Sequence, residues 1–209
     1  VKEMGNQPVK SIASSMARYG MLLFATSVPL LIVFTALAGN VSAMILGAPF
    51  RESAIQLIPI IALGVFIGSL KIHFLDVTFQ LAQRTTQQIW PALLTAVVNV
   101  ALNVAWIPEY GIVGAAYATL AAFLFGCIAS AVMVKKIIPL VLPVTYFFKI
   151  CFAGISMYLL LYFLEFLNGL FALLFQLLCG FFLYVALVIV LNVAGLRHTF
   201  LNIVFKKNA

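Results

Sequence analysis

Long runs of apolar residues dominate this chain, and short polar or Gly/Pro-rich breaks separate them. Divided at those breaks, the sequence predicts six helical spans, at residues 21–45, 53–81, 90–107, 112–134, 144–164 and 170–194. Crossing the apolar layer of a bilayer takes about 20 helical residues. A membrane β-barrel would need alternating apolar and polar positions, which these runs lack. We therefore predict an all-α, polytopic membrane helix bundle with six transmembrane helices.

Composition supports a membrane-embedded chain, because 65% of the residues are hydrophobic and 8% are charged. A soluble domain usually carries about 25% charged residues, which cover its surface in water. The net charge of +7 does not indicate a nucleic-acid partner, because the basic residues are scattered between apolar segments and form no basic face. The expected surroundings are a lipid bilayer.

The basic residues also predict an orientation. If the six spans are correct, ten of the twelve Lys and Arg residues lie on one side of the membrane, and Arg51 lies on the other. The positive-inside rule assigns the richer side to the cytoplasm. We expect both termini there, with residues 1–20 as a cytoplasmic loop segment and 196–209 as a cytoplasmic tail. Because the chain opens at Val1 on a loop-like stretch, we also expect it to be the C-terminal part of a longer protein.

The segment from residue 108 to residue 134 combines a turn with a strip of small residues. Pro108 and Gly111 predict a tight external turn that leaves Glu109 in water. Beyond the turn, small residues recur every four positions: Gly114, Ala118, Ala122, Gly126 and Ser130. Such strips let helix backbones approach closely in lipid, so we interpret this one as a packing surface. The alternative is that it faces a substrate path.

Two asparagines share one face of the span that precedes this turn. Asn99 and Asn103 follow Thr95 at intervals of four residues. A buried amide is unfavourable unless it is hydrogen-bonded. Two interpretations stay open: the asparagines bond between helices, or they line a wet cavity on the substrate pathway.

At this corner the sequence resembles a protein family. The stretch NVALNVAWIPEYGIVGAAYATL, the upstream ILGAPFRESA and the proline-bearing MARYGMLLFATSVPLL are similar, in order and spacing, to segments of bacterial lipid-linked oligosaccharide flippases. These belong to the multidrug/oligosaccharidyl-lipid/polysaccharide exporter superfamily, whose members often have about fourteen helices in two lobes. The resemblance covers residues 15–136.

The resemblance implies that residues 21–136 are a four-helix part of the C-terminal lobe and 137–195 the final two transmembrane helices. It implies a secondary transporter of the bacterial inner membrane that moves polyprenyl-pyrophosphate-linked oligosaccharides for O-antigen, capsule or exopolysaccharide assembly. The implied partners are the missing N-terminal lobe of the same chain and the glycan substrate. A polysaccharide polymerase or glycosyltransferases are further candidates.

The span at 53–81 holds the most informative polar residues. At about 100° per residue, a stripe of six falls within one sector of the helix, while Lys71 points away from it. The stripe consists of Ser69, His73, Asp76, Gln80, Gln83 and Arg84. Ionisable groups inside a membrane suggest function. Cationic groups there would hold the substrate pyrophosphate, and Asp76 and His73 would exchange a proton or bind a coupling cation. Alternatively, the segment extends past the cytoplasmic interface, with Lys71 snorkelling.

Further interpretations remain open. The sequence contains no Gly-rich phosphate loop, HExxH motif or credible nucleophilic triad, so we expect no enzyme activity, cofactor or metal. A multidrug or organic-cation exporter of the same superfamily is the closest competing function. A non-transporting membrane scaffold and a membrane-bound glycan polymerase or ligase are the others. The last would usually show a large external loop with arginines, whereas the predicted external connections are short.

Overall fold

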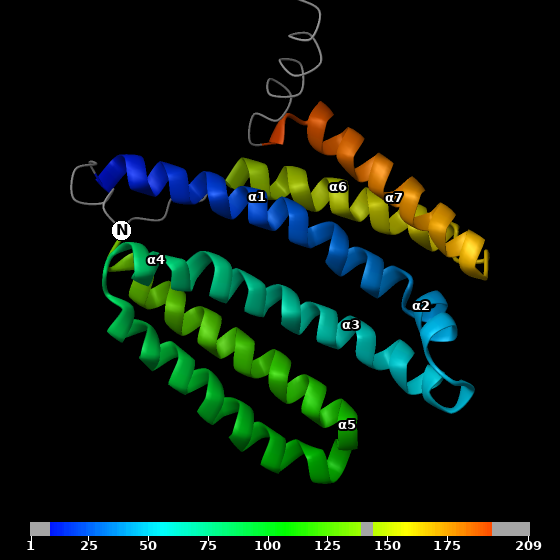
Figure 1. Cartoon of the computed structure of the whole chain (residues 1–209), viewed down its shortest axis with the longest axis horizontal. Coiled ribbons are helices and arrows are strands. Elements are labelled where there is room, and N and C mark those ends of the chain that lie inside the picture. Colours follow the sequence, from blue (N-terminus) through cyan, green and yellow to red (C-terminus); the bar gives the residue numbers. More distant parts are fainter. Residues whose placement is uncertain (1–8, 139–143, 194–209) are drawn as a thin grey trace, which may run out of the picture. The chain divides into compact units, whose positions relative to one another are not determined.

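The computed structural model describes residues 9–138 and 144–193 of the 209-residue chain, with side chains described from residue 13. This part of the chain is helical and contains no strand. The predicted all-α class is therefore confirmed for these residues. The elements are α1 (Val9–Ala36), α2 (Ala38–Ile45), α3 (Ala48–Leu70), the π-helical turn η2 (Lys71–Leu75), α4 (Asp76–Leu81), the 3-10 turn η3 (Thr85–Gln88), α5 (Ile89–Lys135), α6 (Val144–Phe163) and α7 (Leu170–Val190) (Figure 1).

Five helical stretches are long and apolar enough to cross a membrane, as expected of a multi-pass membrane protein. They are Ala13–Ala36, Ala48–Leu81, Thr85–Lys135, Val144–Phe163 and Leu170–Val190. The sequence predicted six because it separated residues 90–107 from 112–134. The structure joins these two segments in the 47-residue α5.

Helix α5 nevertheless reverses direction at Gly111, where φ is 57° and ψ is −135°. Figure 1 shows the two green arms of this helical hairpin meeting near the α5 label. Side chains strongly disfavour this backbone conformation, whereas glycine adopts it readily. Residues 89–110, the first arm, and 112–135, the second arm, are therefore antiparallel neighbours. The reversal lies within the predicted turn at residues 108–111.

The beginning of the described chain differs from the prediction. Helix α1 starts at Val9, so residues 9–20, which we expected in a loop, are helical. A non-helical residue, Leu37, separates α1 from the short α2, which ends at the predicted position, Ile45. Residues 1–8 and the expected tail at 196–209 lie outside the described residues.

The described residues form two compact units. The first unit contains 9–23 and 56–138, and the second contains 24–55 and 144–193. The expected division into a lobe segment at 21–136 and two final helices at 137–195 stays a prediction. Within the second unit, the second half of α1 lies with α6 and α7. Local hydrophobic patterns do not encode this grouping, because contacts between segments more than a hundred residues apart create it.

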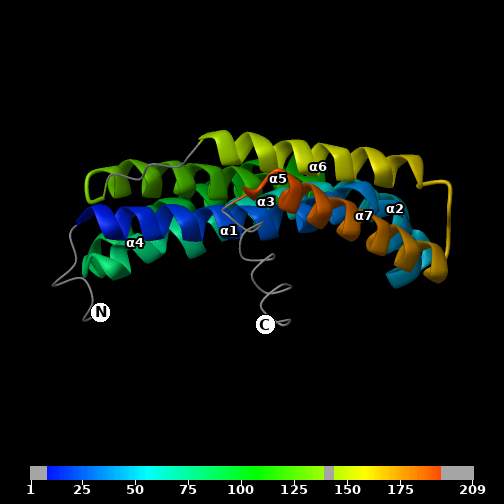
Figure 2. The ribbon, with the colours of Figure 1, turned by 90° about the horizontal axis from the view of Figure 1, so that it is seen from above.

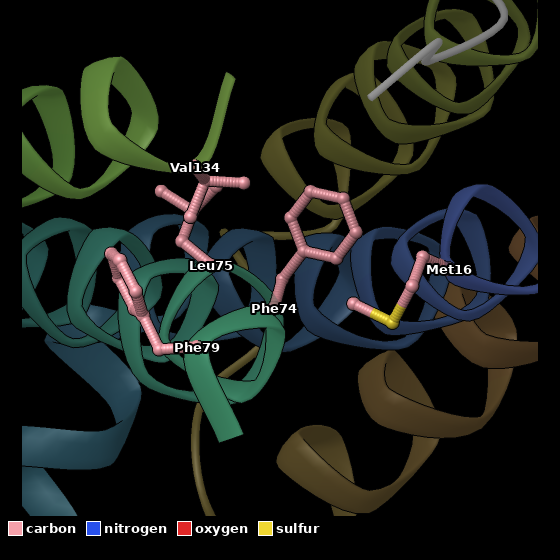
Figure 3. Close-up of a cluster of buried hydrophobic side chains, with 5 residues drawn as sticks. All are labelled: Met16, Phe74, Leu75, Phe79 and Val134. Atoms are coloured by element: carbon pink, nitrogen blue, oxygen red, sulfur yellow. The ribbon is translucent and has the colours of Figure 1, made fainter. Parts of the chain in front are cut away.

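The first unit is built around close helix approaches. A Cβ atom added to Gly64 would lie 3.7 Å from the backbone of Leu120, so α3 and the second arm of α5 are in contact. Gly68 similarly faces the ring of Phe123. Five buried apolar side chains of this unit form a cluster (Figure 3), namely Met16, Phe74, Leu75, Phe79 and Val134.

The second unit is also held by glycine contacts. Helices α6 and α7 run side by side (Figures 1 and 2), with Gly180 of α7 against Met157 and Leu161 of α6. Gly154, on α6, faces Val28 and Ile32 of α1. Small residues at these points allow the close packing that drives helix association in lipid.

A tyrosine completes the hydrogen bonding of α1 in the second unit. Proline has no N–H, so Pro29 leaves the Ala25 carbonyl without its usual helical donor. The hydroxyl of Tyr184 donates to that carbonyl at 2.6 Å, and both Tyr184 and Ala25 are buried. The carbonyl group that lacks a donor within α1 is thus hydrogen-bonded by a side chain of α7.

A buried amide pair connects α2 to α7. The Asn40 Nδ2 atom donates to Gln176 Oε1 at 2.9 Å and to the Leu167 carbonyl at 3.1 Å. Gln176 Nε2 donates to the carbonyls of Leu164 and Leu167 at 2.6 and 3.2 Å. The carbonyls lie in the connection between α6 and α7, so the pair fixes this turn against α2.

Candidate functional site

A buried ion pair lies in the first unit, where helix α3 passes into η2 and α4. Lys71 Nζ is 2.7 Å from Asp76 Oδ2, and the two side chains are 5% and 4% exposed. Charges removed from water are tolerated when they are paired and hydrogen-bonded. The surrounding helices are apolar, so this pair is the principal candidate site of the described chain.

The π-helical turn explains why these two residues meet. In a regular α-helix, residues five apart are separated by about 140° around the axis. In η2 the backbone N–H of Asp76 instead bonds the carbonyl of Lys71, which is the five-residue spacing of a π-helix. The additional residue in this turn brings position 76 back over position 71. The prediction that Lys71 points away from Asp76 is therefore wrong.

The second arm of α5 supplies the other partner of Asp76. Ser130 Oγ donates to Asp76 Oδ1 at 2.8 Å, and Ser130 is fully buried. Each carboxylate oxygen thus accepts one hydrogen bond, one from the ammonium group and one from the hydroxyl group. This arrangement ties the η2–α4 segment to the second arm.

The strip of small residues provides the surface on which the ion pair lies. All five members, Gly114, Ala118, Ala122, Gly126 and Ser130, are buried. A Cβ atom at Gly126 would collide with Thr95 Oγ1 and would lie 3.0 Å from Lys71 Cε. At Gly114 it would lie 2.5 Å from the Trp106 carbonyl oxygen. The strip therefore packs against the first arm and against Lys71.

The other residues of the predicted polar stripe do not join the ion pair. His73, Gln80 and Arg84 are exposed, whereas Asp76 is buried. Asp76 is engaged by Lys71 and Ser130 rather than by His73. The π turn rotates the positions that follow it relative to those before it. A projection at constant angle therefore did not show that Asp76 is buried against Lys71.

The asparagines of the first arm make two kinds of hydrogen bond. Asn99 Nδ2 donates to Thr119 Oγ1 of the second arm at 3.3 Å, which agrees with the interhelical interpretation. Asn103 Nδ2 bonds within its own arm, to the carbonyl and the Oδ1 atom of Asn99. Both residues are half-buried, and neither contacts the Lys71–Asp76 pair in the described hydrogen-bond network.

Sequence reasoning assigned Ser130 to packing alone and missed its bond to Asp76. It also missed the buried Gln176–Asn40 pair. A signal for Gln176 was present, because it is an isolated amide in the apolar run FALLFQLLCG. In lipid such a group needs a hydrogen-bond partner, although the sequence does not show which residue supplies it.

Comparisons with known proteins identified no relative of this chain. A scan against protein-family models found no match, and searches of curated proteins and of solved structures also found none. Function is therefore inferred from the residues and their geometry.

Proposed function

We propose that this chain is the C-terminal portion of a secondary transporter that flips polyprenyl-pyrophosphate-linked oligosaccharides across a bacterial inner membrane. The observation that carries the proposal is the ion pair of Lys71 and Asp76, buried between apolar helices at a π-helical turn. Ionisable groups within membrane spans are unfavourable and mark transport pathways, and π turns are frequent at functional sites. The resemblance of residues 15–136 to flippases supplies the substrate class.

In this proposal the chain crosses the membrane six times, because each arm of α5 forms its own span. The arms are 22 and 24 residues long on either side of Gly111, and about 20 helical residues suffice to cross. The positive-inside rule then assigns both termini to the cytoplasm. A complete transporter of about fourteen helices would work by alternating access between two lobes.

Exposed polar residues in and just after the η2–α4 segment are suited to the anionic part of this substrate. They are His73 in η2, Gln80 in α4 and Arg84 beyond the end of α4. An arginine can form paired, charge-assisted hydrogen bonds with phosphate oxygens. We propose that these exposed residues receive the pyrophosphate, while the buried Lys71–Asp76 pair links binding of the substrate to movement of the second arm through Ser130.

The test uses the complete natural gene in cells that depend on it for surface polysaccharide. Asp76→Asn should abolish export while the protein stays at its normal level in the membrane. Glu109→Gln, at the exposed turn of α5, is the matched control and should export normally. Undiminished export by Asp76→Asn would refute the role of the pair.

Leucines at His73, Gln80 and Arg84 distinguish the competing functions. If these substitutions change only the assembly of the protein in the membrane and leave export intact, the chain is a scaffold. If cationic-drug resistance is lost instead, it is a multidrug exporter.

A further inference from the structure

The Lys71–Asp76–Ser130 cluster is built like a cation-binding site in which a side chain of the protein itself, the ammonium group of Lys71, is the cation. A carboxylate and a hydroxyl group converge there, and the ammonium group of Lys71 lies 2.7 Å from the carboxylate. We propose that Lys71 is a built-in counter-ion that occupies the position of a monovalent metal cation at Asp76. Lys71 thereby excludes Na⁺ from this position and determines the ion specificity of the site.

Oxygen ligands for a metal cation are already present. The Asp76 carboxylate carries the negative charge, and Ser130 Oγ lies 2.8 Å from its Oδ1 atom. Thr95 donates its proton to the Pro91 carbonyl at 2.7 Å, so the lone pairs of its hydroxyl oxygen stay available. Thr95 Oγ1 and Lys71 Cε both lie against Gly126, which makes the hydroxyl group a neighbour of the lysine stem. Hard cations prefer such oxygen donors.

The packing explains why the ammonium group excludes a metal ion. Lys71 is 4% exposed and its stem is in contact distance of Gly126, so the side chain fills the space between η2 and the second arm. Shortening Lys71 to alanine should leave both a vacant space and an uncompensated carboxylate. A Na⁺ ion supplies the missing charge. Lys71→Met, in contrast, removes the positive charge but keeps the space filled.

The experiment measures thermal stability of the purified full-length protein in detergent, at constant ionic strength, while NaCl replaces choline chloride. Lys71→Ala should become more stable as Na⁺ rises, and the natural protein should not respond. At a Na⁺ concentration 100 times the dissociation constant, the unfolding equilibrium constant of Lys71→Ala should fall about 100-fold. Lys71→Met should respond far less, and Lys71→Ala combined with Asp76→Asn should not respond.

The proposal is overturned if folded Lys71→Ala shows the same stability in both salts. It is also overturned if the natural protein shows Na⁺-specific stabilisation that Asp76→Asn removes. If Lys71→Ala folds in neither salt, Lys71→Gln replaces it and should show a weaker Na⁺ response, whose absence overturns the proposal. Binding is measured through stability, so the outcome is separate from that of the export test. The consequence for transport, which rests on the proposed function, is that turnover does not use Na⁺ bound at Asp76.

Discussion

Replacing Tyr184 with phenylalanine tests how the proline-bearing helix α1 is stabilised. The tyrosine hydroxyl donates at 2.6 Å to the carbonyl of Ala25, four residues before Pro29. Phenylalanine keeps the ring and removes the donor. The carbonyl then lacks its usual donor four residues further along the helix, because proline has no N–H. We expect Tyr184→Phe to destabilise the protein through this one unpaired group.

The expected loss in the free energy of unfolding follows from two general ranges of hydrogen-bond energies. Leaving a buried polar group unpaired costs about 1–3 kcal/mol. Interhelical hydrogen bonds in membrane proteins average about 0.6 kcal/mol and reach about 1.7, since the freed groups often find other partners. Here Pro29 removes the nearest alternative donor, and Tyr184 is only 4% exposed. The expected loss therefore lies near the upper end, at about 1–2 kcal/mol.

A double-mutant cycle with Pro29→Ala isolates the effect. Alanine at position 29 restores the N–H, so Tyr184→Phe should then cost about 0.5 kcal/mol or less, which gives a coupling energy of about 1 kcal/mol. The assay is reversible unfolding of the purified protein in mixed micelles of increasing SDS content. Tyr158→Phe, at a tyrosine that is 39% exposed on α6, is the matched control and should be near neutral. Equal losses from Tyr184→Phe in both backgrounds would refute the reasoning.

Three further substitutions test the packing and the polar contacts, each by the same unfolding assay. Gly126→Ala should cost about 1–3 kcal/mol, because its Cβ collides with Thr95 Oγ1, whereas Gly39→Ala meets nothing within 4 Å and should change stability by about 0.5 kcal/mol or less. Gly111→Ala should cost about 1–3 kcal/mol through backbone strain alone, since φ is +57° and its surroundings are open. Gln176→Leu should cost about 1–3 kcal/mol by leaving Asn40 without its amide partner, and no loss would contradict this.

Local features of the fold were predictable because local chemistry determines them. Apolar runs indicated helices, and Pro108 with Gly111 indicated the reversal between the two arms of α5. The strip from Gly114 to Ser130 was recognisable because its spacing of four residues places small side chains on one face. These inferences need no knowledge of which helix lies beside which.

The grouping of helices was not predictable in this way. The second half of α1 contacts α6 and α7 through pairs such as Ala25 with Tyr184, which are 159 residues apart. Nothing in the apolar run around Ala25 distinguishes this partner from any other helix. The Ala25 carbonyl, which Pro29 leaves without its helical donor, and the isolated amide of Gln176 each need a hydrogen-bond partner. Neither group specifies which residue supplies it.

The ion pair shows the same limit within a single helix. A constant 100° projection assumes that the backbone stays α-helical, and on that assumption Lys71 and Asp76 lie on different sides. An isolated charge in an apolar interior is far less favourable than one turn of irregular hydrogen bonding. Formation of the π turn at Lys71–Leu75 therefore allows both charges to be buried and paired. Opposite charges five residues apart in an apolar run are thus a signal that the helical period itself changes, because pairing within the chain requires it.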